Sequence, residues 1–202
     1  MTNKNIVFEE KYSKYIEPLY GDTRNENDDN LLLEDNILPH SMSIPSVERI
    51  NLTHLDTYTI DPEGCTDADD AFSISESGNK LNLAIHIADP TEFINMNSLL
   101  WKYIENRIVT KYPSNRKPLH MLPTKIIQQS SLMDNEYGNL KLAITVSSEI
   151  DKTTFLPIGE QKLYFSKVFV PKSNNFTYNE AANRIESLKE LSYGIKISRA
   201  LQ

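Results

Sequence analysis

The chain has 202 residues, of which 39% are hydrophobic and 24% charged, and its formal net charge is −7. No apolar run approaches the roughly 20 residues that a membrane-spanning helix needs, and the N-terminus lacks the apolar core of a signal peptide. A single cysteine, Cys65, excludes an internal disulfide and a cysteine-rich zinc site, so we expect an intracellular, cytoplasmic protein with no membrane partner.

The charges are distributed unevenly. Residues 1–70 contain 16 acidic and 5 basic residues, a net charge of −11, whereas residues 71–202 contain 12 acidic and 16 basic residues, a net charge of +4. Between residues 102 and 125 a single acid, Glu105, stands among six basic residues, which are Lys102, Arg107, Lys111, Arg116, Lys117 and Lys125. Two tyrosines are interleaved with them. Such a basic strip is typical of a surface that follows a phosphate backbone.

The first part of the chain, residues 1–47, alternates short apolar pieces with polar and acidic ones that cannot form a core by themselves. We expect a partly ordered acidic arm there, followed by a folded domain over residues 48–202. From Tyr58 the pattern becomes typical of strands. Residues 58–60 lead into a Pro-Glu-Gly turn, and a second strand begins at Ala71.

A third strand is expected over residues 81–88, where apolar and polar side chains alternate, after a turn at residues 77–79. The apolar spacing then becomes helical over residues 97–111, with Asn97 or Ser98 as the N-cap. The apolar face of this helix is predicted to contain Leu100, Tyr103, Ile104 and Ile108.

Two more strands are predicted at residues 140–146 and 162–170. Thr177 and Glu180 have the spacing of a capping box and open a helical tail. Its apolar stripe consists of Ile185, Leu188, Leu191 and Ile195. We expect this stripe to lack a partner within the chain. Taken together, the elements predict an α+β fold with an antiparallel sheet as its core and helices flanking it.

Four aspartates lie close together between the first two predicted strands: Asp61, Asp67, Asp69 and Asp70. Carboxylates packed this closely repel one another unless a cation or a proton compensates them. Magnesium and manganese prefer such oxygen ligands, and metal ions can stabilise the attacking and leaving oxygens of a phosphoryl transfer. The strands on either side should hold the cluster against a core. The pattern therefore favours a divalent metal site.

The acidic segment could instead be a solvated loop that binds no metal. A calcium loop starting at Asp67 fails, because Phe72 and Gly78 stand where that loop needs a glycine and a glutamate. His86, on the polar face of its strand, could assist a metal site or be a hydrogen-bonded structural residue. Tyr103 fits the helix core better than a surface, whereas Tyr112 precedes a proline and is expected to be exposed.

The segment from Asp61 to Phe72 resembles the first signature of the RNase II/RNase R family catalytic domain, the RNB domain. Its Gly-Cys pair is most similar to the exosome-associated eukaryotic branch. Further elements of the family follow in the same order: His-Ile-Ala-Asp at residues 86–89, Met-Leu-Pro at 121–123, Ser-Leu at 131–132 and Tyr-Asn-Glu-Ala at 178–181. These matches extend over roughly residues 48–200.

This resemblance implies a processive 3′ to 5′ exoribonuclease that hydrolyses single-stranded RNA to nucleoside monophosphates with Mg²⁺, or with Mn²⁺ in its place. By position in the motif, Asp61, Asp67 and Asp70 correspond to the metal ligands. Asp69 corresponds to the catalytically essential carboxylate.

The resemblance also assigns one RNA contact, because Tyr112 corresponds to the tyrosine that stacks on RNA near its 3′ end. The charge of the basic strip itself predicts further RNA contacts at Arg107, Lys111, Arg116 and Lys117. The sequence departs from the family pattern at Ile108, where the family usually has a glycine.

A larger departure is an arginine-rich element that the family carries downstream to stabilise the phosphate, since nothing after Tyr178 resembles it. We therefore expect a partial RNB-type catalytic domain, to which either a second polypeptide or a continuation of the gene beyond residue 202 would add the missing element. The alternative is a catalytically inert RNA-binding or interaction module that retains the fold.

Overall fold

The computed structural model describes residues 26–37, 47–112, 114 and 118–202. The chain forms two compact units. One unit comprises Met1–Ile44 and Pro90–Ile127, and the other comprises Pro45–Asp89 and Gln128–Gln202. Among the residues described, no helix is long and apolar enough to cross a membrane.

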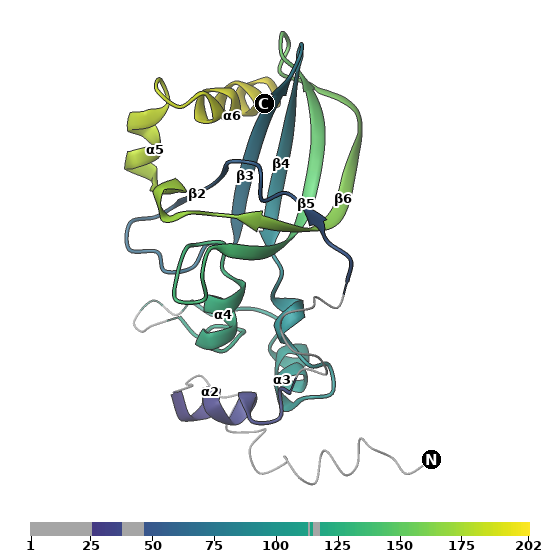
Figure 1. Cartoon of the computed structure of the whole chain (residues 1–202). Coiled ribbons are helices and arrows are strands. Elements are labelled where there is room, and N and C mark those ends of the chain that lie inside the picture. The colour runs from purple at the N-terminus through teal and green to yellow at the C-terminus, as the bar shows by residue number, and fades with distance from the viewer. Residues whose placement is uncertain (1–25, 38–46, 113, 115–117) are drawn as a thin grey trace. The chain divides into compact units, whose positions relative to one another are not determined.

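The second unit is built around a sheet whose described strands follow the order β1-β6-β5-β4-β3-β2-β7 (Figure 1). Their bounds are β1 Ile50–Asn51, β2 Thr57–Asp61, β3 Asp70–Ser77, β4 Lys80–Ala88, β5 Leu140–Asp151, β6 Pro157–Phe169 and β7 Asn175–Thr177. Neighbouring strands from β6 to β2 are antiparallel, whereas the short edge strands β1 and β7 pair in parallel with β6 and β2. The predicted α+β fold with an antiparallel sheet is confirmed.

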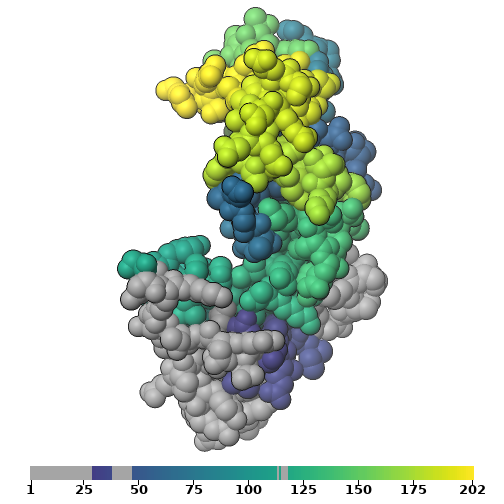
Figure 2. Space-filling view, turned by 90° about the vertical axis from the view of Figure 1, so that its left-hand side faces the viewer, coloured from purple at the N-terminus to yellow at the C-terminus, as the bar shows by residue number. Residues whose placement is uncertain are grey.

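Two C-terminal helices of this unit, α5 Tyr178–Arg184 and α6 Lys189–Ala200, pack on one face of the sheet after the short 3₁₀ helix η2 Lys172–Asn174 (Figure 1). The predicted capping box is present, because the Thr177 side chain accepts from the Glu180 amide and the Glu180 side chain accepts from the Thr177 amide. In the space-filling view, α5 and α6 form the yellow-green and yellow surface of this unit (Figure 2).

The expectation that the C-terminal apolar stripe lacks a partner is wrong. Leu191 is buried with Tyr58 and Phe176, and Ile197 is buried with Ile74 of β3. The helical tail divides into two short helices, which lets both reach the sheet. Burial of these apolar side chains, at roughly 1.5–3 kcal/mol for each, is what holds α6 in place.

A chain of hydrogen-bonded polar side chains crosses the buried interior from β2 to β6. Thr57 Oγ1 lies 2.9 Å from Ser73 Oγ, which lies 3.0 Å from His86 Nε2. His86 Nδ1 lies 2.8 Å from Thr145 Oγ1, and Thr145 Oγ1 lies 2.6 Å from Ser166 Oγ. All five residues are buried, so each partner is needed to satisfy the others. His86 is therefore a structural residue of the sheet.

Acid pH is expected to destabilise the protein through His86. Burial lowers the pKa of His86 from 6.5 to about 4. Below pH 6.5 the unfolded chain takes up a proton that the folded chain does not, so stability falls as the pH falls toward 4 and is unaffected above 6.5. Urea unfolding at pH 7 and pH 4.5 measures the effect. Between pH 7 and pH 4.5 the free energy of unfolding should fall by about 2.5 kcal/mol more in the parent chain than in His86→Gln. An equal fall in the two proteins would contradict this prediction.

The first unit is helical in its described part, with α2 Glu26–Leu33, the 3₁₀ helix η1 Pro90–Phe93, α3 Leu99–Arg107 and the start of α4 Thr124–Ser130. Leu32 is fully buried and packs with Leu99, Leu100 and Tyr103. Part of the predicted acidic arm is therefore a helix packed on residues much later in the chain. The division between residues 47 and 48 stays a prediction.

Helix α3 is shorter than predicted. Ser98 is its N-cap, as expected, and its side chain accepts from the Trp101 amide. The helix ends at Arg107, so Lys111 lies outside it. The prediction that Ile108 belongs to the apolar face of this helix is wrong, because the Ile108 side chain is 71% exposed.

Candidate functional site

The four aspartates lie where β2 ends and β3 begins. Asp61 is the last residue of β2, Asp70 is the first residue of β3, and Asp67 and Asp69 lie in the connecting loop. β2 and β3 are antiparallel, with Thr57 opposite Ser73. The observed β2–β3 pairing covers Thr57–Tyr58 and Phe72–Ser73, and the loop that carries Asp67 and Asp69 joins the strand ends at which Asp61 and Asp70 lie. The loop reaches the surface as a dark blue segment beside α5 (Figure 2).

The loop begins with the predicted turn. The Cys65 amide donates to the Pro62 carbonyl at 3.1 Å, and Gly64 has a φ of 80°, which favours glycine. The Cys65 thiol donates to the Asp67 carbonyl oxygen at 2.9 Å. Cys65 is therefore a loop-closing residue whose hydrogen bond fixes the backbone next to a candidate metal ligand.

A second set of contacts clamps Ala68, which lies between Asp67 and Asp69 and is fully buried. The Ala68 amide donates to Ser131 Oγ at 3.0 Å, and the Ala68 carbonyl accepts from the Leu132 amide at 2.9 Å. The Asp69 carbonyl accepts from the Ala88 amide at 2.8 Å. The Ser-Leu pair of the family pattern thus anchors the aspartate loop from a segment more than 60 residues away.

Ser131→Ala is expected to lower the free energy of unfolding by about 2 kcal/mol, because it leaves the buried Ala68 amide without an acceptor. The same hydroxyl accepts from the Met133 amide at 3.1 Å, which adds to the loss. Urea unfolding measures the change. Ser173→Ala is the matched control, because Ser173 is exposed and its hydroxyl bonds to the Asn174 side chain. If Ser173→Ala lowered the free energy of unfolding as much as Ser131→Ala, the hydrogen bond from the Ala68 amide to Ser131 would not explain the loss.

The electrostatics of the cluster centre on Asp61. Burial raises its pKa, the carboxylates of Asp70, Asp69 and Asp67 raise it further, and a hydrogen bond from the Thr59 side chain opposes them. Its Oδ2 atom is buried and has no hydrogen-bond partner among the residues that the structure describes. A buried carboxylate oxygen without a donor, surrounded by negative charge, is stabilised by a cation.

The cluster has the chemistry of a divalent-ion site, although its side chains are not gathered around one point. Within the described residues, no group of three or more His, Cys, Asp or Glu side chains is already arranged to hold a metal ion. The donor set is nevertheless of the hard oxygen type that Mg²⁺ and Mn²⁺ prefer, and within the described part of the chain Asp61 Oδ2 is a buried acceptor without a donor. Asp69 and Asp70 are exposed and Asp67 is half-buried. In the chemistry of their donor atoms, the residues present fit the ion.

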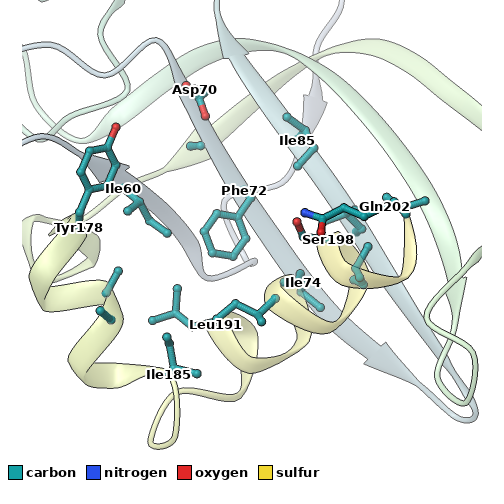
Figure 3. A pocket seen from close by; sticks show the side chains of 18 residues that line it. Ile60, Asp70, Phe72, Ile74, Ile85, Tyr178, Ile185, Leu191, Ser198 and Gln202 are labelled. Atoms are coloured by element: carbon teal, nitrogen blue, oxygen red, sulfur yellow. The ribbon is translucent and has the colours of Figure 1, made fainter.

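An apolar groove of about 690 Å³ adjoins the cluster between the sheet and helices α5 and α6. Asp70 stands at one end of it, with Ile60 and Phe72 on the strands and Tyr178 on α5 (Figure 3). Tyr178 is 60% exposed. The groove gives one candidate metal ligand an apolar neighbourhood.

The candidate RNA-binding residues lie in the first unit, whereas the aspartates lie in the second. Tyr112 is 76% exposed, as predicted, and Lys111 is exposed and pairs with Leu119 in an isolated bridge. Arg107 is only 6% exposed, which does not suit a direct contact with a phosphate. Arg116 and Lys117 lie outside the described residues. The RNA role of these residues stays a prediction.

The backbone directly after α3 adopts a strained turn. Ile108 has a φ of 66° and a ψ of −40°, and the Val109 amide donates to the Arg107 carbonyl at 2.7 Å. This is a γ-turn of the rare positive-φ type, and a β-branched residue is a poor occupant of it. The family pattern has a glycine at this position, which suits such a backbone.

Ile108→Gly is therefore expected to stabilise the protein by about 1 kcal/mol, because it relieves strain worth about 1–3 kcal/mol at the cost of some backbone entropy. The exposed side chain contributes little burial. Val109→Gly is the control, since Val109 is also exposed and its φ is not positive. Denaturant unfolding should show that Ile108→Gly raises the free energy of unfolding and that Val109→Gly lowers it. A lower value for both variants would mean that the backbone at Ile108 is not strained.

A family model for the RNB domain matches residues 49–201. The chain belongs to the RNB family. It is 30% identical over 127 residues to the human 3′-5′ exoribonuclease HELZ2, covering 62% of this chain and 4% of that protein. It is 31% identical over 147 residues to the human exosome complex exonuclease RRP44, covering 69% of this chain and 14% of that protein. The chain thus spans a small part of the length of these relatives.

Solved structures confirm the RNB-type fold. The apo form of Mycoplasma genitalium RNase R superposes with a TM-score of 0.71 at 21% identity, covering 89% of this chain and 28% of that chain. Yeast Ssd1, described as a pseudonuclease, superposes with a TM-score of 0.63 at 20% identity, covering 75% of this chain and 19% of that chain. The chain therefore has the fold of part of an RNB domain.

Proposed function

We propose that this RNB-family chain is a magnesium-dependent 3′ to 5′ exoribonuclease module that hydrolyses single-stranded RNA to nucleoside monophosphates. The proposal is supported by the relatives named as exoribonucleases and by one structural observation. In the part of the chain that the structure describes, Asp61 Oδ2 is buried without a hydrogen-bond donor, and the neighbouring carboxylates raise the pKa of Asp61. We place the activity in the cytoplasm.

Asp61, Asp67 and Asp70 would hold Mg²⁺, with Mn²⁺ as a substitute. The bound ion supplies Lewis-acid stabilisation of the negative charge on the phosphate oxygens. The Asp69 carboxylate, exposed just before β3, accepts the proton of the attacking water. The water oxygen bonds to phosphorus as the bond to the 3′ oxygen breaks, the 3′ oxygen takes up a proton from solvent water to become a hydroxyl, and a nucleoside monophosphate is released.

Tyr112 and Lys111 would bind the substrate. An exposed tyrosine can stack on a base, an interaction worth about 1–3 kcal/mol, and a lysine neutralises the phosphate next to it. A structure of M. genitalium RNase R holds ribose-methylated single-stranded RNA, which supports the same substrate class here. The partner we propose besides RNA is a second polypeptide that supplies an arginine to the phosphate.

The alternative function is an inert RNA-binding or interaction module. The likeness to Ssd1, a pseudonuclease, favours this alternative. So does the finding that, within the described residues, no three carboxylates are already arranged as metal ligands. Against it stands the set of four carboxylates, since an inert module has no need to keep mutually repelling groups together.

The experiment that separates the two uses the whole chain with Mg²⁺ and single-stranded RNA labelled at its 3′ end. The proposed function predicts early release of labelled nucleoside monophosphate, and no release when a 3′-terminal block is present. The inert module predicts that the RNA is retained on the protein and stays intact. Release of long fragments, as from an endonuclease, would contradict both.

A further inference from the structure

The side chain of Asn175 is fixed between two partners. Its Oδ1 atom accepts from the Asp134 amide at 3.1 Å, and its Nδ2 atom donates to Thr59 Oγ1 at 3.0 Å. A backbone amide can only donate, so the Asp134 contact determines which end of the Asn175 amide faces Thr59. The pairing of β7 with β2, which places Asn175 opposite Thr59, brings the two side chains together.

This orientation determines what Thr59 can do. Because its oxygen accepts from Asn175, its single hydroxyl hydrogen is left to donate elsewhere. Thr59 is fully buried, where a hydroxyl needs partners, and it lies two residues before Asp61 on the same face of β2. Donation from the Thr59 hydroxyl lowers the pKa of Asp61 against the effect of burial. A carboxylate can only accept, so a hydrogen bond from Thr59 to Asp61 would continue the direction that runs from Asp134 through Asn175 to Thr59.

We propose that Asn175 and Thr59 are positioning residues for Asp61. They hold its carboxylate by a hydrogen bond from Thr59 so that Oδ2, which has no hydrogen-bond partner within the described residues, stays available to a divalent cation. The inference rests on the proposed function, in which Asp61 binds the metal, and adds to it two residues that touch neither metal nor RNA. Hydrogen-bonding partners of metal ligands commonly change metal affinity about 10–100-fold when they are removed.

The first test compares two substitutions of Thr59 in the full chain, using Mn²⁺ as the probe and isothermal titration calorimetry to measure its dissociation constant. Thr59→Val keeps the branched shape but removes the hydroxyl, whereas Thr59→Ser keeps the hydroxyl. Thr59→Val should weaken Mn²⁺ binding about 10-fold or more. Thr59→Ser should stay within about threefold of the parent chain, because it retains the donor to Asp61.

The second test compares two neighbouring asparagines that both bond to β2. Asn174 Nδ2 donates to the Thr57 carbonyl at 3.1 Å, so Asn174→Ala removes a tether to the strand without touching Thr59 or Asp61. Asn175→Ala removes the donor to Thr59. Asn175→Ala should weaken Mn²⁺ binding about 10-fold and Asn174→Ala should leave it unchanged, with thermal melting confirming that both variants are folded.

The outcomes separate this inference from the proposed function. Equal Mn²⁺ affinities for Thr59→Val and Thr59→Ser, or for the two asparagine variants, overturn the positioning role. A parent chain that binds no Mn²⁺ overturns it as well. If the parent chain binds Mn²⁺ but releases no monophosphate from RNA, the proposed function fails while the affinities still decide whether Asn175 and Thr59 position Asp61.

Discussion

Replacing Asp69 with asparagine should lower the rate of RNA hydrolysis by at least about 100-fold while the protein remains folded. Asparagine has nearly the same shape but cannot accept a proton from water, and general base catalysis is commonly worth about 10²–10⁴ in rate. The Asp69 backbone carbonyl still accepts from the Ala88 amide in the variant, because this contact does not involve the side chain. Single-turnover release of monophosphate with saturating Mg²⁺ gives the rate.

The control for this substitution is Asp56→Asn, which makes the same change of charge at an exposed position just before β2. The rate of Asp56→Asn should stay within about twofold of the parent rate, because solvent and salt screen the effect of one exposed charge outside the cluster. Comparable rates for Asp69→Asn and the parent chain would show that Asp69 is not the essential carboxylate.

Asp89→Ala is expected to destabilise the second unit by about 3–5 kcal/mol, the largest effect on stability that we predict. The Asp89 carboxylate forms an ion pair with the Arg49 guanidinium at 2.5 Å, and both side chains are completely buried. Arg49 Nη1 also donates to the Ala143 carbonyl at 3.2 Å. Removing the carboxylate would leave the buried Arg49 guanidinium without the charge of Asp89 beside it.

Equilibrium unfolding in urea measures this loss, and a double variant shows its cause. Arg49→Met combined with Asp89→Leu removes both charges and should be more stable than Asp89→Ala alone, because no uncompensated charge remains. A double variant as unstable as the sum of its two single variants would mean that packing, and not the ion pair, holds these residues.

The strands of the second unit could be predicted because their apolar side chains alternate, as at Leu81, Leu83, Ile85 and Ile87. The short strands β1 and β7 could not, because two or three residues are too few to show a period. The end of α3 was also missed. The apolar spacing continues through Ile108, and only the backbone shows that the chain leaves the helix there with a positive φ.

The candidate site was predictable in part. The four aspartates are close in sequence, so their charge repulsion could be recognised from residue spacing alone. Ser131 was marked only by the Ser-Leu resemblance, and its contact with Ala68 depends on the fold. Asn175 gave no signal, because it meets Thr59 across 116 residues of sequence and through a side chain whose orientation only hydrogen bonding determines.

The most direct test of the account is to locate the metal. In the full chain Fe²⁺ takes the place of Mg²⁺, and hydroxyl radicals produced with ascorbate and peroxide cut the backbone near the ion. Cuts are predicted within residues 61–70 and near Leu132 and Ala88, which contact that loop, and excess Mg²⁺ should suppress them. Cuts concentrated in the acidic helix α2, or cuts that Mg²⁺ does not suppress, would contradict a metal site at the four aspartates.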